Sequence, residues 1–283
     1  MITSNGYALD EDPTRFGALE PVPLEERNDR DALWSRLRRE GYLYLTGHLD
    51  RENVEQFREY YFSSLRSTGL VAAASDPRDG LGTSGPVDLA ELRRILYDDI
   101  IPGHHYNALT TQPRIRDWFS WLLGDDVHLH KRRIIRHTRA GESGIGTATQ
   151  AHYDLVYLRE GTDRVLSMWI PLGDCPVSRG GLLYLERSHR RVLEQEAAGT
   201  LPHPARSITA DLPRLAEEHD ARWLAANYAA GDVVVHSAHI IHASGDNSDP
   251  DGVMRLSTDI RYQRLSEPID WRWQNDWNED DGL

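Results

Sequence analysis

Apolar residues recur at helical spacing over the first half of the chain. Residues 29–40 carry apolar side chains on one helical face, and Gly41 follows them as a stop signal. Residues 50–65 repeat this pattern, with Asp50 placed as the N-cap. The pattern therefore predicts two amphipathic helices. The other elements predicted for this half are a strand over 42–47 and helices over 88–98 and 112–123.

From residue 127 onward the apolar residues form short strand-like runs, separated by Gly, Pro, Asp and Ser. The helical segments that parallel βαβ units need are missing, apart from a polar stretch over 188–225 that fits a loop plus a helix. We therefore expect a mainly β protein, an antiparallel sandwich or barrel with flanking helices packed outside it. The runs are 127–138, 151–158, 164–173, 181–186, 231–237 and 255–264.

The remaining segments show neither the helical nor the strand pattern of apolar residues. Residues 1–28 predict an irregular arm over the surface, and the Gly-, Ser- and Ala-rich residues 67–87 predict a loop, either a lid over a pocket or a surface excursion. The length of 283 residues suits one domain spanning 1–283. Three indoles crowd the C-terminal tail and should pack on the sheet, on the mouth of a site or on a second subunit: Trp271, Trp273 and Trp277.

Composition narrows the classes of partner. The formal net charge is −13, and the basic cluster at 131–133 is too short to offset it, so nucleic acid is not expected as a partner. A single cysteine, Cys175, excludes an internal disulfide and fits a reducing compartment, for which the cytoplasm is the default. No apolar run is long enough to span a membrane. The oligomeric state is left open.

One of the strand-like runs, "AHYDLVYL" at 151–158, carries two metal-ligand residues. On a strand, His152 and Asp154 project from the same face. A hydrogen-bonded core histidine followed by a turn aspartate gives the same pattern, so the pair alone is weak. The segment "GDVVVHSAHIIHASGDN" supplies a third ligand from His236, His239 or His242. Two histidines and one carboxylate form the facial triad of non-haem Fe(II) oxygenases, although zinc accepts the same ligands.

Several motifs together resemble the phytanoyl-CoA dioxygenase family of Fe(II)/2-oxoglutarate oxygenases. The resemblance covers roughly residues 127–262, and the order and spacing of its motifs make it more specific than the H-x-D pair. The motifs are "HYD" at 152–154, "WIPLGD" at 169–174, "GGLLYLERSH" at 180–189, "GDVVVHSAHIIHASGDN" at 231–247 and "RLSTDIRY" at 255–262.

The resemblance implies a jelly-roll core, a double-stranded β-helix with the metal between its two sheets. It assigns the third ligand to His242 and leaves His236 and His239 to packing or support. It places the arginine that pairs with the far carboxylate of 2-oxoglutarate at Arg255, and a guanidinium fork suits that group. Ser257, two positions after Arg255, and Ser244, two positions after His242, are candidates for further hydrogen bonds to 2-oxoglutarate. Hydroxyls that only satisfy nearby backbone groups would give the same pattern.

The sequence departs from the family pattern in the segment after the Gly-Gly pair. The family often has glycine before the Ser-His of this segment, where this chain has Arg187. An arginine is costly if the turn needs positive φ, so we expect a different local turn. His189 in the same segment is expected to be structural.

The resemblance implies an enzyme that uses Fe(II), 2-oxoglutarate and O₂, releases succinate and CO₂, and hydroxylates a small molecule. Asp154 disfavours halogenation, because related halogenases have a small residue at that position. Candidate substrate contacts are Arg133, Tyr157 and Trp169, each of which also fits a surface or core role.

Two other functional classes are compatible with parts of this pattern. The first is a non-catalytic jelly-roll binding protein, which has no need for all four of His152, Asp154, His242 and Arg255. The second is a cupin-like metal enzyme that does not use 2-oxoglutarate. A cupin more often shows H-x-H followed closely by a glutamate, whereas here the nearest glutamate after Asp154 is Glu160.

Overall fold

Two β-sheets and a layer of helices make up the protein. The structure is a computed structural model that describes residues 1–158, 160–202 and 207–278. The larger sheet runs in the order β4-β10-β7-β12-β5, with β6 also paired to β12, and the smaller in the order β11-β8-β9-β3. All pairs within these sheets are antiparallel except β3 with β9. The prediction of a mainly β, jelly-roll type of fold with flanking helices is confirmed.

The strands of the larger sheet are β4 (Tyr42–Leu45), β5 (Val127–Leu129), β6 (Ile134–Thr138), β7 (Leu166–Pro171), β10 (Val233–Ser237) and β12 (Arg255–Arg264). Those of the smaller sheet are β3 (Phe16–Ala18), β8 (Leu182–Leu185), β9 (Trp223–Ala225) and β11 (His242–Ser244). A separate hairpin joins β1 (Thr3–Ser4) to β2 (Tyr7–Ala8).

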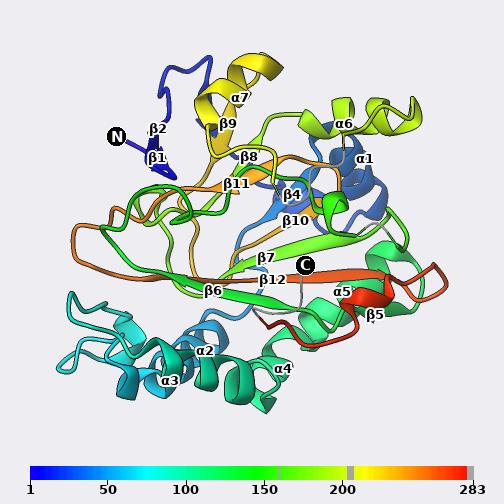
Figure 1. The fold of residues 1–283 in the computed structure, drawn as a ribbon. Coiled ribbons are helices and arrows are strands. Elements are labelled where there is room, and N and C mark those ends of the chain that lie inside the picture. Colours follow the sequence, from blue (N-terminus) through cyan, green and yellow to red (C-terminus); the bar gives the residue numbers. More distant parts are fainter. Residues whose placement is uncertain (159, 203–206, 279–283) are drawn as a thin grey trace.

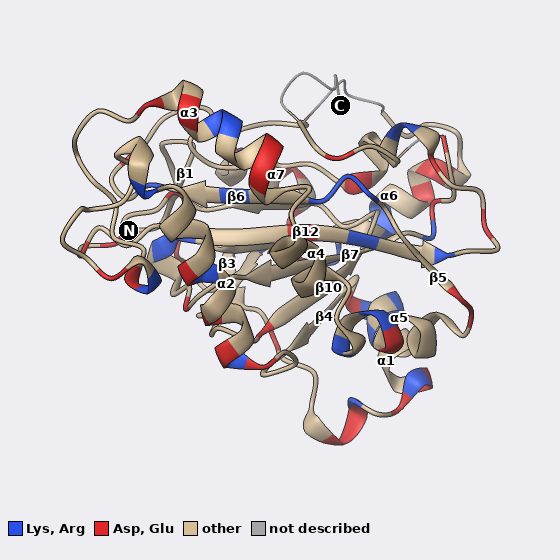
Figure 2. Ribbon diagram, turned by 90° about the horizontal axis from the view of Figure 1, so that it is seen from below, with Lys and Arg blue, Asp and Glu red and all other residues tan. Residues whose placement is uncertain are grey.

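Helices cover the outer face of the larger sheet. In Figure 1, α2, α3 and α4 lie along one side of β6 and β12, and Figure 2 looks at this layer from below. Their buried apolar residues form one core with those of the sheet. The helices of this layer are α1 (Arg30–Glu40), α2 (Arg51–Ser64), α3 (Leu89–Arg94) with its continuation η4 (Ile95–Ile100), α4 (His104–Thr110) and α5 (Pro113–Leu123). The smaller sheet carries α6 (Ser188–Ala197) and α7 (Leu212–His219).

The caps of the first two helices are those that the sequence predicts. The side chain of Asp29 accepts hydrogen bonds from the backbone N–H groups of Asp31 and Ala32, and Gly41 ends α1 at φ 83°. Asp50 accepts from the N–H of Asn53 at the start of α2. Helix α4 was not predicted from the sequence, because it is short and its polar residues hide the apolar period.

Side chains alternate along the strands and give the larger sheet two different faces. On β7, Leu166, Met168 and Ile170 belong to the core under the helices, whereas Ser167 and Trp169 face the smaller sheet. On β12, Leu256, Ile260 and Tyr262 join the core under the helices. The alternate residues of β12 turn into the space between the sheets, and they include charged side chains. This space is therefore polar at one end.

The N-terminal segment is more regular than predicted. Residues 1–28 contain the β1–β2 hairpin and strand β3, which extends the smaller sheet by pairing with β9. The buried side chain of Asp246 accepts from the backbone N–H groups of Asn5 and Gly6, which fixes the hairpin to the body of the protein. The prediction of an irregular arm is wrong for these strands. They pair through backbone hydrogen bonds, and strands of two or three residues are too short to show an alternation of apolar and polar side chains.

The C-terminal tail packs within the molecule. Trp273, in η7 (Trp271–Trp273), is 1% exposed and lies against the guanidinium groups of Arg132 and Arg261. The ring of Trp277 meets that of Tyr97 edge to face. Intramolecular packing is thus confirmed for two of the three indoles, and Trp271 is 71% exposed.

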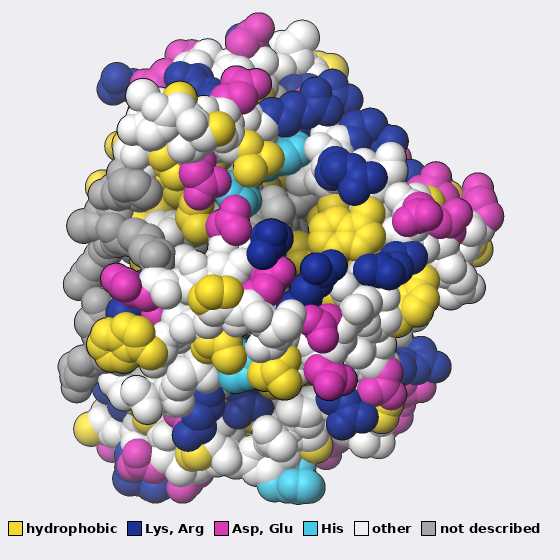
Figure 3. All heavy atoms as spheres, turned by 90° about the vertical axis from the view of Figure 1, so that its right-hand side faces the viewer, with side chains coloured by type: hydrophobic (Ala, Val, Ile, Leu, Met, Phe, Trp, Pro, Cys, Tyr) yellow, Lys and Arg dark blue, Asp and Glu magenta, His cyan; other side chains and the backbone are white. Residues whose placement is uncertain are grey.

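Charges of both signs are interspersed over the face of the molecule seen in Figure 3. This face offers no extended basic surface of the kind that polyanions need. Among the described residues, no helix has the length and apolar character required to cross a membrane.

The segment 67–87 is fixed to the body of the protein through Arg58 of α2. It contains two short turns, η2 (Arg66–Thr68) and η3 (Pro77–Asp79). The guanidinium of Arg58 is 6% exposed and donates to the carbonyl oxygens of Arg78 and Asp79 in this segment, at 2.8 and 2.9 Å. It also donates to the carbonyls of two sheet-side residues, Leu172 and Met254, at 3.1 Å each. Burial lowers the pKa of Arg58 to about 10, so it stays cationic at neutral pH.

We expect Arg58→Met to lower the free energy of unfolding by about 3 kcal/mol, because it leaves four carbonyl groups, two of them in buried hydrogen bonds, without their charged donor. Urea unfolding followed by circular dichroism measures this loss. Arg116→Met, at a side chain that is 61% exposed, is the control and should change stability little. An equally small effect at Arg58 would show that the segment does not depend on this guanidinium.

Candidate metal centre

The chain reaches the site between the two sheets at His152 and leaves it in a tight turn. The backbone of His152 pairs with that of His242 as an isolated antiparallel bridge, and Tyr153 is extended. Asp154 then begins a 3₁₀ turn, η5 (Asp154–Val156). The prediction of a continuous strand over 151–158 is therefore wrong. The extended conformation of Tyr153 is nevertheless enough to place His152 and Asp154 on the same side, while the ring of Tyr153 packs in the opposite core.

His152 and His242 present the same ring nitrogen to Asp154. The Nε2 atoms of the two rings lie 3.8 and 3.9 Å from Oδ1 of Asp154. The Nδ1 atoms lie 2.9 Å from the carbonyl of Gln150 and 3.0 Å from that of Ile240, respectively. A carbonyl can only accept, so each Nδ1 carries the proton and each Nε2 lone pair faces the carboxylate. Burial lowers the pKa of both imidazoles, which keeps them neutral and able to bind a metal.

The carboxylate of Asp154 is fully buried and paired. Arg261 on β12 donates from Nη2 to Oδ1 at 2.9 Å and from Nε to Oδ2 at 3.3 Å, and the hydroxyl of Ser167 on β7 donates to Oδ2. Burial alone would raise the pKa of Asp154. The Arg261 charge and the neighbouring histidines outweigh it, so that the pKa of Asp154 lies well below its usual range. The three ligand atoms of His152, Asp154 and His242 all lie within 4.8 Å of one another, close enough for one metal ion.

The other histidines of the 231–247 segment have different surroundings. His236 is fully buried, and its Nδ1 lies 2.9 Å from the hydroxyl of Tyr184. Burial raises the pKa of Tyr184 well above its usual value, so its hydroxyl stays neutral. The Nε2 atom of His236 is buried and has no hydrogen-bond partner among the described residues. That nitrogen lies 3.5 Å from Oδ2 of Asp154, so the ring of His236 packs against the carboxylate. His239 points elsewhere and contacts Glu196 at 2.8 Å.

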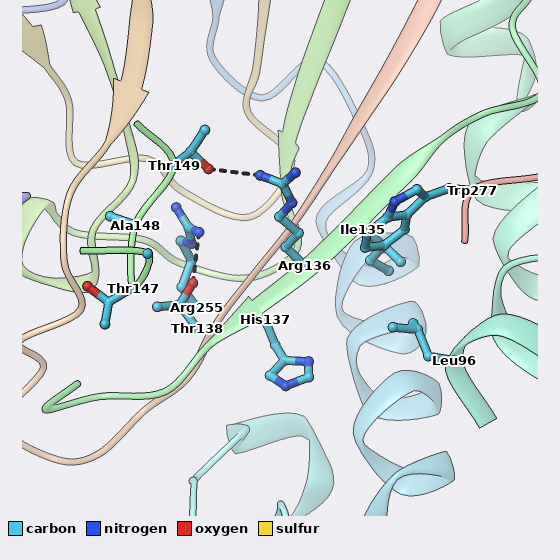
Figure 4. A pocket seen from close by; sticks show the side chains of 11 residues that line it. Leu96, Ile135, Arg136, His137, Thr138, Thr147, Ala148, Thr149, Arg255 and Trp277 are labelled. Carbon is cyan, nitrogen blue, oxygen red and sulfur yellow. Dashed lines mark hydrogen bonds between the residues drawn. The ribbon is translucent and has the colours of Figure 1, made fainter. Parts of the chain in front are cut away.

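Arg255 lies in an adjoining cavity of about 420 Å³. Its side chain is 5% exposed and donates to the carbonyl of Gly180 at 2.5 Å and to the hydroxyl of Thr138 at 2.8 Å. Its Nε has no hydrogen-bond partner, and no carboxylate of the described residues forms an ion pair with it. Figure 4 shows Arg255 beside Thr138 and Thr149, with Arg136 on the neighbouring strand.

The two serines predicted to bind 2-oxoglutarate are both buried near this cavity. Ser244 is 1% exposed and accepts a hydrogen bond from the N–H of Thr149 at 2.8 Å, so its own proton stays available. Ser257 is 4% exposed and pairs across the strands with Arg136. It shares the inward face of β12 with Arg255.

Only one of the three predicted substrate contacts lies at the metal centre. Tyr157 lines a cavity of about 140 Å³ together with His152 and His242. Trp169 is 1% exposed and packs on Tyr228, with ring centroids 4.8 Å apart. Neither Trp169 nor Arg133 is among the described residues that line this cavity.

Arg133 instead turns toward the helical layer. It donates to the hydroxyl of Thr110 at 2.6 Å and lies over the ring of Tyr106. Arg133 directly precedes β6. Because side chains alternate along a strand, its side chain points away from the space between the sheets. We therefore correct the interpretation of Arg133 and Trp169 as substrate contacts.

Two further expectations concern segments outside the site. Arg187 adopts φ 55° and ψ 13°, so the turn keeps positive φ without a glycine and the expected change of turn is wrong. His189 contacts the carbonyl of Arg38 at 3.1 Å, as expected for a structural residue. No described residue of 67–87 lines either cavity at the site, so the structure gives no support to the lid interpretation of that segment.

The sequence interpretation missed Arg261, Ser167 and Arg136. The two arginines stand on strands that also carry residues of the site. Arg261 follows Arg255 by six positions on β12, so the two share a face, and Arg136 lies two positions before Thr138 on β6. A charged residue within a strand-like run was the signal that could have identified the arginines, whereas Ser167 gave no such signal.

A comparison with protein families matches residues 37–255 to the phytanoyl-CoA dioxygenase model. The chain belongs to the phytanoyl-CoA dioxygenase family. It is 28% identical over 262 residues to a protein named 1-deoxypentalenic acid 11-beta-hydroxylase from Streptomyces exfoliatus. The aligned region covers 89% of this chain and 87% of that protein.

Solved structures of two enzymes from nogalamycin biosynthesis share the fold of this family member. The carbocyclase SnoK, described as non-haem and alpha-ketoglutarate-dependent, superposes with a TM-score of 0.59 at 21% identity, over 89% of each chain. The epimerase SnoN, solved with Fe³⁺, alpha-ketoglutarate and nogalamycin RO, superposes with a TM-score of 0.57 at 22% identity, over 85% of each chain.

Family, relatives and metal cluster agree on the chemistry. The chain is an Fe(II)/2-oxoglutarate-dependent oxygenase, and His152, Asp154 and His242 can bind the metal. This separates it from the zinc and cupin-like alternatives, which the ligand set alone leaves open.

We expect His242→Ala to abolish Fe(II) binding, because it removes one of three ligands, whereas His239→Ala should bind iron like the unchanged protein. Anaerobic calorimetric titration with Fe(II) measures both. Loss of iron in His239→Ala together with binding in His242→Ala would reverse the ligand assignment.

Arg261→Gln should weaken Fe(II) binding by about tenfold or more, because the guanidinium orients the carboxylate ligand. The same titration measures the change, and Arg264→Gln, at a residue three positions along the chain and 40% exposed, is the matched control. Tighter iron binding in Arg261→Gln would show instead that the arginine competes with the metal for Asp154.

Proposed function

We propose that the chain binds Fe(II) through His152, Asp154 and His242, binds 2-oxoglutarate through Arg255 with help from Ser257 and Ser244, and hydroxylates a small molecule. We further propose that residues 1–283 act as one catalytic domain in the cytoplasm. The observation that carries this proposal is the pairing of a preset metal cluster with a buried, carboxylate-free guanidinium in the next cavity.

The residues fit a divalent metal. Both imidazoles have Nδ1 fixed by a backbone carbonyl and Nε2 directed at Asp154. Each ligand is buried, and each is in the ionisation state that coordination needs. When bound, iron and 2-oxoglutarate together supply the oxidising chemistry, in which O₂ is consumed and succinate and CO₂ are released.

The residues also fit a dicarboxylate. Arg255 has an unpartnered Nε inside a cavity with three threonines, so a carboxylate would satisfy both the charge and the donor. The two cavities share Arg136 and Thr149, so a molecule held by Arg255 can extend to the metal ligands. The protein's part is to hold this molecule, fix the ligand rotamers and limit access of water.

Hydroxylation is the outcome that the relatives favour. The Streptomyces exfoliatus protein is named as a hydroxylase. The two nogalamycin enzymes are named as an epimerase and a carbocyclase, and at their level of identity they support the fold alone. A small-molecule substrate is supported by the modest volume of the metal-side cavity.

The proposal is tested by anaerobic titration of the metal-free protein with Fe(II) and then with 2-oxoglutarate, followed by visible spectroscopy. An α-keto acid chelated to Fe(II) gives a weak charge-transfer band, so the band should appear only when both are present. Arg255→Gln should raise the 2-oxoglutarate concentration for half-maximal band at least about tenfold, because a charged pair is lost.

Arg116→Gln is the control for the removal of an exposed arginine. Bound iron without a band on adding 2-oxoglutarate would favour a non-catalytic or cupin-like protein. An unchanged 2-oxoglutarate dependence in Arg255→Gln would remove Arg255 from the site.

A further inference from the structure

Arg136 lies between the metal centre and the Arg255 cavity. It stands on β6 with Ile134 and Thr138 on the same face, directly across from Ser257 of β12. Its side chain lines both the 420 Å³ cavity of Arg255 and the 140 Å³ cavity of His152 and His242. Figure 4 shows it extending between Ile135 and Thr149 into this space. Arg136 is therefore the charged side chain that the two cavities share.

The guanidinium of Arg136 forms no ion pair with a described residue. Its hydrogen bond goes to the hydroxyl of Thr149, at 2.9 Å, which satisfies one N–H group. The carboxylate of Asp259 lines the metal-side cavity with it, and its negative charge acts on Arg136 without direct contact. No ion pair within 4.0 Å joins Arg136 to an acidic group in the part of the chain that the structure describes. Arg136 thus keeps donors for a ligand.

The guanidinium groups around the two cavities outnumber the carboxylates. Arg132, Arg136, Arg255 and Arg261 contribute four positive charges, and Asp154 and Asp259 contribute two negative charges. A divalent metal and a doubly charged 2-oxoglutarate cancel each other. The loaded site therefore keeps an excess of positive charge, which favours an anionic ligand.

The metal-side cavity also has apolar and aromatic walls beside its charged groups. Its walls include Ile134 and Leu182 from the two sheets and Trp273 and Trp277 from the C-terminal tail. Such walls favour an apolar skeleton, and a few placed polar groups then fix its orientation. The combination of the Arg136 guanidinium with these walls fits an amphiphilic anion.

We propose that Arg136 binds the carboxylate of the substrate, and that the substrate is a small organic acid with an apolar skeleton. This inference rests on the proposed function, because it takes His152, Asp154 and His242 as the metal site and leaves the co-substrate to Arg255. A guanidinium fork binds a carboxylate through two hydrogen bonds and so fixes which carbon of the skeleton faces the metal ligands.

The test is a panel of small cyclic and acyclic carboxylic acids, each paired with its methyl ester. Binding to the protein loaded with Fe(II) and 2-oxoglutarate is measured anaerobically by the shift of the charge-transfer band. Thermal-shift measurements on the metal-free protein provide a second readout that does not depend on the loaded site. We expect hits among the acids and none among their esters.

Three variants assign the effect to Arg136. Arg136→Gln should weaken binding of the acid hits at least about tenfold, because it removes a charged hydrogen-bonded pair. Arg136→Lys should recover part of that loss, and Arg116→Gln should bind like the unchanged protein. The 2-oxoglutarate concentration that gives half of the maximal charge-transfer band should be the same in all three variants as in the unchanged protein.

The proposal is overturned if no acid in the panel binds, if esters bind as well as acids, or if Arg136→Gln binds the acids unchanged. It is also overturned if Arg136→Gln weakens 2-oxoglutarate instead, which would assign the residue to the co-substrate. Failure of the proposed function is a different result, because the band would then be absent before any acid is added.

Discussion

The buried carboxylate of Asp154 is the constraint on which the site depends. A carboxylate without solvent contact is strongly unfavourable unless it is paired and hydrogen-bonded. Here the compensation comes from Arg261 on β12, Ser167 on β7 and His236 on β10. These three strands are neighbours in the larger sheet. Their order therefore fixes the carboxylate, while His242 reaches it from the smaller sheet, so that the metal centre joins the two sheets.

At one end, the interior between the sheets departs from the usual arrangement of a β-sandwich, in which the facing sides are apolar. The apolar face of β7 and β12 packs under the helices, and the other face carries Arg255, Asp259 and Arg261. Such an interior costs stability, and Arg255 Nε and Arg261 Nη1 remain without hydrogen-bond partners. Polar groups are thus buried at the site without enough partners, against the usual rule for a protein interior. A bound metal and bound anions would supply the missing partners.

The walls of the metal-side cavity come from segments far apart in the sequence. Tyr157 follows the metal turn, Leu182 belongs to β8, and Trp273 and Trp277 come from the tail. The fold is shared with proteins named as a carbocyclase and an epimerase. One scaffold can serve different reactions through differences in such walls. The C-terminal tail is part of the cavity in this chain.

The sequence by itself determined the class of fold and the first two helices with their caps, and its resemblance to the family indicated His152, Asp154 and His242 as metal ligands and Arg255 as the partner of 2-oxoglutarate. These features depend on short-range patterns: apolar periodicity, a capping residue, and motifs of fixed spacing. The tertiary structure decided what depends on contacts between distant strands. It broke the expected strand at Asp154 into a turn, added β3 to the smaller sheet, and turned Arg133 and Trp169 away from the metal-side cavity. It also placed Arg261 on Asp154 and Arg136 between the cavities, because strand register, which sets these pairs, comes from backbone pairing across more than a hundred residues.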